Sequence, residues 1–360
     1  MKKSFLVVLL VLVMFVGGCN TKGKSPTSKI KIEKYNFSSI SITGENSGWA
    51  IGEDKVYRTT DGCKHWKDVS PQNTSKIYSY SYYFLDSNNA WVLSSNRILY
   101  RTKDGGNNWK SEKVPFNSAI FFFMPYGNDY KGWALKDYGM ASGDEPVDVY
   151  KFENDSWVLI CKGEIPQVQN QNKGTIPWAG EKTGFVFLPD AKTGFVTIQY
   201  RAIDKYGLYI TKDGGYTWAK GELPIPEKNV EILMKAPKVF TRGTSSTIIL
   251  PVCLEEKENT NTAIFFTTTD KGNTWYKETS LKVKGRIINI DILNKSCYFV
   301  LTENKLYGTN NGNSWTELSY PKNAVQVQFV NVKVGYALIK SGVNTNILYT
   351  DDGGHSWKNL

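Results

Sequence analysis

A short phrase ending in tryptophan recurs along this chain, and it constrains the fold more than any other feature of the sequence. It reads TTDGCKHW at 59–66, TKDGGNNW at 102–109, TKDGGYTW at 211–218, TTDKGNTW at 268–275, GTNNGNSW at 308–315 and TDDGGHSW at 350–357. A further tryptophan, Trp157, falls between the second and third copies, and successive tryptophans of the series lie 40 to 61 residues apart. Self-similarity at this period indicates a fold built from repeated units.

Each unit is predicted to contain four short strands. In the last unit, Val325, Val327 and Phe329 alternate with Gln326 and Gln328, which is the period of a strand with one apolar face. Three further short segments follow, at 335–338, 346–350 and 356–358, and the phrase lies between the last two.

The same order recurs at other places in the chain. Tyrosines at 78, 80 and 82 alternate with serines, and isoleucines at 288, 290 and 292 alternate with Asn289 and Asp291. Four-stranded units of 40 to 60 residues in radial repetition form β-propellers. Because one tryptophan closes each unit, we expect an all-β fold, a seven-bladed β-propeller of four-stranded antiparallel blades, with residues 29–360 as a single domain.

Two parts of the repeat are irregular. The third unit lacks the phrase, since its segments 147–152 and 156–161 are joined only by residues 153–155. The fourth and fifth units are longer than the others, which predicts insertions in their loops.

The recurring phrase resembles the Asp-box, or BNR repeat, of sialidases, sortilin-type receptors, some glucanases and photosystem II assembly factors. The Asp carboxylate is expected to accept hydrogen bonds from its own turn, the glycine to supply a special backbone conformation, and the Trp to pack between sheets. We therefore interpret the boxes as structural, with Cys63 in place of one glycine and with Gly308 and Asn310 at the Thr and Asp positions of the fifth copy. The predicted box residues are Thr59, Asp61, Trp66, Thr102, Asp104, Trp109, Thr211, Asp213, Trp218, Thr268, Asp270, Trp275, Asn310, Trp315, Thr350, Asp352 and Trp357.

The N-terminal segment is interpreted as a processing signal. Two lysines precede an apolar stretch at 5–16, which is too short to span a bilayer stably. The sequence VGGC at 16–19 resembles a bacterial lipobox, so we expect residues 1–18 to be removed and Cys19 to carry the lipid; the alternative is an ordinary secretory signal. Residues 19–28 then form a flexible tether, and the chain is exported and anchored to the outer face of a bacterial membrane.

Composition narrows the function classes. The net charge of +10 comes mostly from dispersed lysines, without a basic stripe or a nucleic-acid motif, so no nucleic-acid partner is expected. Both histidines lie inside boxes, which argues against a catalytic triad or a zinc site, and we expect no metal and no cofactor. Apart from Cys19, the four cysteines are predicted to be buried apolar side chains and not disulfides.

The whole chain is similar to exported propellers of the photosystem II assembly and stability factor type. This resemblance covers about residues 38–360 and rests on the rhythm of segments such as 48–66 and 90–109. It implies a non-catalytic, monomeric propeller that binds or helps to assemble a protein or cell-envelope polymer. The alternative is a glycoside hydrolase of sialidase or glucanase type, but the F-R-I-P phrase usual in sialidases is absent and nothing indicates an arginine triad.

Any ligand face is expected on the unrepeated loops. The longest lie at 136–146, 162–182 and 199–207, in the third and fourth units. They should bring aromatic side chains and one arginine together, although these residues could instead pack only their own loops. The candidate residues are Tyr138, Trp178, Tyr200, Arg201 and Tyr206.

Overall fold

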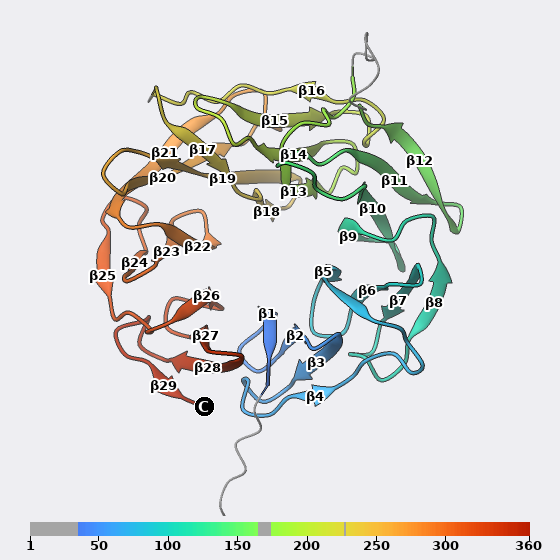
Figure 1. Ribbon diagram of the computed structural model, residues 1–360, viewed down its shortest axis with the longest axis horizontal. Coiled ribbons are helices and arrows are strands. Elements are labelled where there is room, and N and C mark those ends of the chain that lie inside the picture. Colours follow the sequence, from blue (N-terminus) through green and yellow to red (C-terminus); the bar gives the residue numbers. More distant parts are fainter. Residues whose placement is uncertain (1–34, 165–173, 227) are drawn as a thin grey trace, which may run out of the picture. The chain divides into compact units, whose positions relative to one another are not determined.

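Seven antiparallel sheets succeed one another around a common centre (Figure 1). The computed structural model describes residues 35–164, 174–226 and 228–360, and Lys34–Leu360 forms one compact unit. The predicted signal at 1–18, the lipid site at Cys19 and the tether at 19–28 lie outside the described residues.

Each sheet is one blade, and the strands of a blade follow one another in the chain. Blades 1 to 3 contain β1 (Phe37–Ile42), β2 (Gly48–Gly52), β3 (Lys55–Thr59), β4 (Lys67–Asp68); β5 (Ile77–Phe84), β6 (Ala90–Ser94), β7 (Ile98–Thr102), β8 (Lys110–Lys113); and β9 (Ala119–Tyr126), β10 (Asp129–Asp137), β11 (Val147–Glu153), β12 (Ser156–Lys162). Blades 4 and 5 contain β13 (Glu181–Phe187), β14 (Gly194–Gln199), β15 (Tyr206–Thr211), β16 (Ala219–Lys220); and β17 (Glu231–Met234), β18 (Lys238–Arg242), β19 (Ser245–Glu255), β20 (Thr260–Thr268), β21 (Tyr276–Lys284). Blades 6 and 7 contain β22 (Ile287–Asn294), β23 (Cys297–Thr302), β24 (Leu306–Thr309), β25 (Thr316–Leu318); and β26 (Ala324–Phe329), β27 (Gly335–Ser341), β28 (Asn344–Thr350), β29 (Lys358–Asn359).

The predicted seven-bladed propeller is therefore confirmed, with one addition in blade 5. There β19 is eleven residues long, and both β17 and β18 pair with it, so this sheet has five strands. The inner strand is interrupted at residues 235–237, where Pro237 has no backbone N–H to donate. The insertion predicted for this unit is thus partly an extension of its inner hairpin.

The box turns lie on one face of the propeller, and the long loops between second and third strands and between blades lie on the opposite face. Box turns join the third and fourth strands of a blade, and they bond to the turn between its first and second strands, as Gly62 N–H does to Asn46 O (3.1 Å) and Gly105 N–H to Asn88 O (3.0 Å). We call this side the box face. The other side, which carries the connections from second to third strands and from blade to blade, is called the loop face.

The closing tryptophans pack in the seams between blades. Seven hydrophobic clusters fill the seven seams, and each contains the tryptophan of one blade together with side chains of the preceding blade. Trp218, for example, lies with Trp133 and Phe187 between blades 3 and 4 and is only 3% exposed. Burial of so large an apolar surface contributes about 2 to 3 kcal/mol per side chain. The repeat therefore stabilises the ring as well as the single blade.

Side-chain amides complete the ring between blade 7 and blade 1. Gln326 accepts a hydrogen bond from Ile40 N–H (3.1 Å) and donates one to Ile40 O (2.7 Å). Gln328 does the same with the backbone of Ile42, at 2.8 and 2.9 Å. In addition, Thr345 bonds to Tyr35 O and receives Phe37 N–H. The polar residues of β26 thus act as a short ladder between two separate sheets.

Polar positions of β22 work in the same way. Asn289 accepts a hydrogen bond from Val327 N–H (2.9 Å), and Asp291 accepts one from Phe329 N–H (2.7 Å). The polar residues that alternate with isoleucine at 288–292 are therefore on the side of β22 that faces blade 7.

The expected alternation is wrong at the start of β5. Tyr80 is 61% exposed and stacks on Tyr78, while Ser81 is completely buried. The reason is a register shift between Ile77 and Tyr82, which turns the intervening residues out of the ladder with β6.

All regular elements of the described residues are strands, and no helix among them could cross a membrane. Cys63, Cys161, Cys253 and Cys297 are buried and unpaired, as predicted. Burial raises the pKa of the last three thiols to about 11.

Candidate functional site

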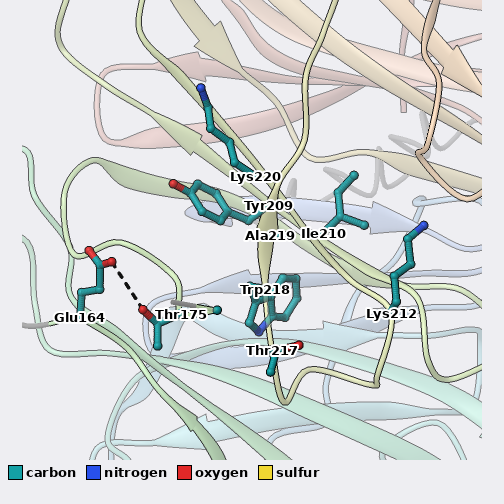
Figure 2. A pocket seen from close by; sticks show the side chains of 10 residues that line it. Glu164, Thr175, Tyr209, Ile210, Lys212, Thr217, Trp218, Ala219 and Lys220 are labelled. Atoms are coloured by element: carbon teal, nitrogen blue, oxygen red, sulfur yellow. Dashed lines mark hydrogen bonds between the residues drawn. The ribbon is translucent and has the colours of Figure 1, made fainter. Parts of the chain in front are cut away.

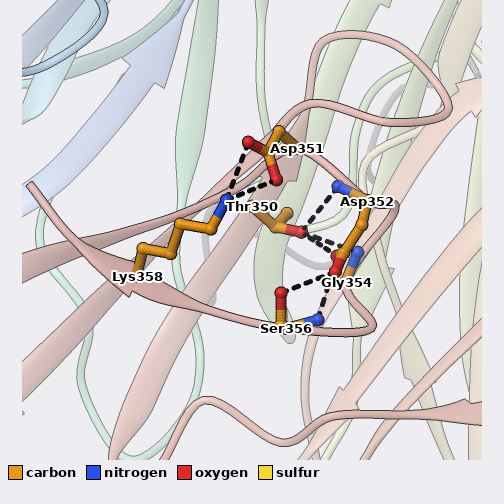
Figure 3. A network of polar contacts seen from close by, with 6 residues as sticks. All are labelled: Thr350, Asp351, Asp352, Gly354, Ser356 and Lys358. Carbon is orange, nitrogen blue, oxygen red and sulfur yellow. Dashed lines mark hydrogen bonds and ion pairs between the residues drawn. The ribbon is translucent and has the colours of Figure 1, made fainter.

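The last box shows what its aspartate does (Figure 3). Asp352 accepts hydrogen bonds from the Thr350 hydroxyl (2.8 Å), the Ser356 N–H (2.9 Å) and the Ser356 hydroxyl (2.5 Å). The Thr350 hydroxyl oxygen accepts in turn from Gly354 N–H at 2.9 Å. The carboxylate thereby closes a seven-residue turn, and these donors hold its pKa well below the ordinary value.

The same contacts recur in the other boxes that carry aspartate. Asp104, Asp213 and Asp270 each accept from the Thr two residues before and from the N–H four residues after. In each case the pKa of the carboxyl group is lowered, to about 2 for Asp270, chiefly by its hydrogen bond to the Thr274 hydroxyl. Such groups are poor general acids at neutral pH because they do not hold a proton.

The first box differs at two positions. Asp61 accepts from Thr59 and from His65 N–H, and its second oxygen lies 2.6 Å from the exposed His65 ring. Cys63 takes the glycine position with a φ of 66°, in the left-handed region that side chains other than glycine rarely adopt. Its buried thiol packs in the seam with blade 7.

The assignment of Asn310 in the fifth box, which belongs to blade 6, is wrong by one residue. The hydroxyl of Thr309 donates to Asn311 Oδ1 (3.1 Å), and Asn311 accepts from Ser314 N–H (2.9 Å). Thr309 and Asn311 thus make the contacts that had been expected of Gly308 and Asn310. The turn is one residue shorter between its Thr and its Trp, so matching the copies by their last residue displaced the register.

On the loop face, the connections of blades 3 and 4 are tied together. Glu145 N–H donates to Trp178 O (3.1 Å), Gly180 N–H donates to the Asp144 carboxylate (2.9 Å) and Lys182 N–H donates to the Glu145 carboxylate (2.6 Å). The loop between β10 and β11 therefore fixes residues 178–182, which lead into β13.

The buried side chain of Lys182 stabilises the backbone of residues 178–180, which precede β13. Its ammonium donates to the carbonyl oxygens of Trp178 (3.1 Å), Ala179 (3.2 Å) and Gly180 (2.8 Å), and the residue is 4% exposed. Burial lowers the pKa of Lys182 to about 8, while Glu145 and Asp144 act in the opposite direction. At neutral pH the group is still mainly charged and uses all three of its hydrogens.

Four of the five candidate residues lie on the surface that these connections form. We call it the tied surface, and it comprises residues 138–146, 178–182 and 199–203. Tyr138 is 56% exposed, its hydroxyl bonds to the Asp148 carboxylate at 2.5 Å, and Lys136 lies over its ring. Trp178 is half-buried, and Arg201 is exposed and lies beside Gly143, where an added Cβ would be 3.2 Å from its Cδ. Tyr200 packs half-buried against the seam cluster of blades 3 and 4 and beside Gly180.

Tyr206 does not join them. Its hydroxyl bonds to Glu222 and Leu223, and its ring packs in the seam between blades 4 and 5. Strand β15 directs it to the side of blade 5, so for this residue the structure favours a packing role.

A hollow of about 640 Å³ lies at the outer edge of blade 4 (Figure 2). Glu164, hydrogen-bonded by the Thr175 hydroxyl, stands on one side of Trp218, and Lys212 stands on the other. Glu164 is the one carboxylate among the described residues that line it, and these residues do not supply the pair of acids that glycoside hydrolysis requires. No group of three or more His, Cys, Asp or Glu side chains that could hold a metal is found among the described residues.

Comparisons with known proteins agree with the propeller. A family model described as "Photosynthesis system II assembly factor YCF48" matches residues 9–115. The chain is similar to YCF48. A structure titled "YCF48 bound to D1 peptide" superposes with a TM-score of 0.53 at 14% identity and covers 88% of this chain and 93% of that one. YCF48 from Cyanidioschyzon merolae gives 0.51 at 14%, with 89% and 94% covered.

The same fold also occurs in an enzyme. An oligogalacturonate lyase from Vibrio parahaemolyticus superposes with a TM-score of 0.60 at 8% identity, covering 90% of this chain and 92% of that one. No match was found among curated proteins. Likeness at these identities establishes the architecture shared with YCF48, and the chemistry must be argued from this chain's own residues.

Two parts of the site were missed from the sequence of this YCF48-like chain. Lys182 was expected only as the end of the loop at 162–182. Its neighbours in the sequence, Glu181, Thr183 and Gly184, give no sign that this lysine is buried and that its charge must be satisfied internally. The described residues of the connection between β16 and β17 also lie on the loop face, where the Asp204 carboxylate accepts hydrogen bonds from Asn229 N–H and Val230 N–H.

Proposed function

We propose that this protein is a non-catalytic propeller that binds a protein partner, or helps to assemble one, through the loop face of blades 3 and 4. The observation that carries the proposal is the tied surface of residues 138–146, 178–182 and 199–203. It holds Tyr138, Trp178 and Arg201 partly or fully exposed on a rigid support. Exposed aromatic and arginine side chains on a fixed backbone are typical anchors of protein interfaces.

The comparison supports a polypeptide as the partner, because a YCF48 structure carries a D1 peptide. Cell-envelope polymer is the second kind of partner that the proposal includes, since the chain is basic and is expected to lie beside an anionic envelope.

The proposal also places the propeller outside the cytoplasm, attached by lipid on Cys19. Globomycin treatment of the native host should leave the precursor uncleaved, and Cys19→Ser should abolish labelling with a fatty-acid analogue and likewise leave the precursor uncleaved. Labelling of Cys19→Ser with the fatty-acid analogue at the level of the wild type would contradict lipid anchoring without touching the binding proposal.

Binding is tested by crosslinking and affinity purification of the full chain from native membranes. The double variant Trp178→Ala/Arg201→Ala should lose the partner that the wild type recovers, by about tenfold or more. The matched control is Tyr276→Ala, which removes an aromatic side chain that is 62% exposed on blade 5. Equal recovery by the double variant would sink the assignment to this face.

Glycoside hydrolysis is the alternative, and one contact favours it. Tyr138 and Asp148 form a tyrosine–carboxylate pair, which is the kind of group that sialidases use as a nucleophile. However, burial and Asp148 raise the pKa of Tyr138, which opposes formation of a phenolate. Release of sugar from sialosides or glucans by the wild type, lost in Tyr138→Phe, would establish the enzyme and overturn the proposal.

A further inference from the structure

Three successive blades place a cation across from a tryptophan on the box face. Trp49 pairs with Arg58, Trp91 with Arg101 and Trp133 with Lys151, always on the second and third strands. The cationic groups lie over the indole rings, at 5.7, 5.4 and 6.0 Å from the ring centres. The three pairs are thus equivalent positions of the repeat.

In blades 1 and 3, the box of the following blade covers this pair. A Cβ on Gly105 would lie 2.5 Å from Arg58 Cζ, so the bare glycine backbone of box 2 rests directly on the guanidinium. Arg58 Nε–H donates to Ser87 O at 2.9 Å. In the seam of blades 3 and 4, Gly214 of the next box lies close to Lys151, and its carbonyl accepts from Trp133 Nε1 at 2.9 Å.

The pair in blade 2 has no such cover, because blade 3 has the short turn after Glu153 in place of a box. A cavity of about 200 Å³ opens there, walled by Trp91, Phe123, Tyr130, Phe152 and Trp157. At its edge, Arg101 Nε is buried and without a hydrogen-bond partner among the described residues. A buried N–H left in this way is destabilising until an acceptor reaches it.

The other side chains around the cavity are held in place by contacts within the chain. Arg101 is held by Asp129 (2.5 Å) and by the Tyr130 ring, 4.6 Å from its Cζ. Trp157 takes the seam position of a box tryptophan and donates to Glu112 at 3.1 Å. What is missing is therefore the glycine turn and not the tryptophan. In blade 1 the carbonyl that accepts from Arg58 Nε–H is Ser87 O, which lies in the turn between β5 and β6.

We propose that this cavity binds a glycine-bearing turn of a partner polypeptide, which lays its bare backbone on Arg101 and gives a carbonyl oxygen to Arg101 Nε. The partner would supply in trans the glycine turn that the neighbouring seams receive from their own chain. The site is on the box face, on the opposite side from the loop surface proposed above, so either can fail alone.

The probe is the blocked peptide acetyl-TKDGGNN-amide, which has the sequence of residues 102–108 and lacks the tryptophan because Trp157 already occupies that position. Binding to the full chain is measured by saturation-transfer NMR, with an expected dissociation constant of about 1 mM for one turn. The analogue with both glycines changed to alanine should bind at least about tenfold more weakly, since the methyl group at the first glycine, which corresponds to Gly105, would overlap the guanidinium.

Two changes in the protein complete the test. Arg101→Gln should weaken binding of the glycine peptide by about tenfold, whereas Arg97→Gln, the same charge change on the loop face of this blade, should leave it unchanged. Replacing residues 152–156 by TKDGGNN should fill the cavity from within, abolish binding and raise the melting temperature.

The proposal is overturned if the peptide does not bind at 10-fold the expected dissociation constant, or if the alanine analogue binds equally. It is also overturned if Arg101→Gln binds like wild type. If the chain with residues 152–156 replaced does not fold, the Arg101→Gln variant still decides the test.

Discussion

Two neighbouring aspartates in the last box have different tasks. Asp352 accepts three hydrogen bonds inside the turn, while Asp351 makes only an exposed ion pair with Lys358 at 2.8 Å (Figure 3). Exposed ion pairs contribute little, whereas loss of the turn's acceptor leaves several donors without a partner.

We therefore expect Asp352→Ala to lower the denaturant midpoint clearly more than Asp351→Ala does. Since the pKa of Asp352 is lowered in the fold, its charge-dependent contribution is complete above pH 3.8 and is lost progressively below that pH. Urea titrations of both variants and the wild type from pH 7 to pH 3 measure this. Equal midpoints for the two variants at pH 7 would contradict the structural role of the box aspartate.

Lys182 provides a second test at single-residue scale. Lys182→Met leaves three carbonyls without their common donor and should reduce the free energy of unfolding at pH 7 by about 3 kcal/mol. Lys205→Met, an exposed position on the same face, is the control and should stay within about 0.5 kcal/mol.

The pH dependence of Lys182 has a definite sign. Its pKa is about 8 in the fold, against an ordinary value of 10.5 for a lysine, so between these two pH values the unfolded chain binds one proton more than the folded chain. The wild type should therefore gain up to about 3 kcal/mol relative to Lys182→Met between pH 8 and pH 10.5. Equilibrium unfolding of both proteins across this range would show a constant difference if the lysine were not buried.

At the scale of one element, a box hairpin can pack closely against the preceding blade because it carries glycine at the point of contact. Gly106 has a φ of 83°, and a Cβ there would lie 2.7 Å from the Val69 side chain of blade 1. Gly127 also has a positive φ, 60°, but nothing lies within 4 Å of its added Cβ. Gly127→Ala should cost only the backbone strain, about 1 kcal/mol, and Gly106→Ala about 2 to 4 kcal/mol because overlap is added.

Thermal or chemical unfolding of the two variants separates strain from overlap. Equal losses would mean that the box hairpin can move away from Val69, and that seam packing does not depend on the glycine.

Local patterns could be predicted because their causes are local. The box phrase, with Asp, Gly and Trp in this order, specifies a turn through its own hydrogen bonds. The hairpins and the number of blades therefore follow from the spacing of the tryptophans along the chain. The register of Thr309 and Asn311 and the exposure of Tyr80 could not be predicted, since one depends on a missing residue in the turn and the other on a bulge against β6. Loop length indicated the surface of blades 3 and 4, but the contacts of Asp144, Glu145 and Lys182 that shape it join residues 33 to 37 positions apart.

At the scale of the whole molecule, closure is the feature that no single repeat can encode. Blade 1 comes entirely from the start of the described chain and blade 7 from its end, so no strand is exchanged between them. In many repeat arrays a terminal unit is the first to open, because one of its neighbours is joined to it only through space. Here the amides of Gln326 and Gln328 supply four hydrogen bonds across that seam.

Replacing both glutamines by leucine should lower the free energy of unfolding by about 2 to 4 kcal/mol, because four backbone groups of β1 lose their partners. Hydrogen exchange should then accelerate first in β1 and β26, while β14 and β15 on the far side of the ring keep their protection. The matched comparison is Asn289→Leu, which removes one such contact between blades 6 and 7, where the chain itself still joins the two sheets. If the double glutamine variant exchanges uniformly around the ring, the seam between blades 7 and 1 is not the point at which the propeller opens.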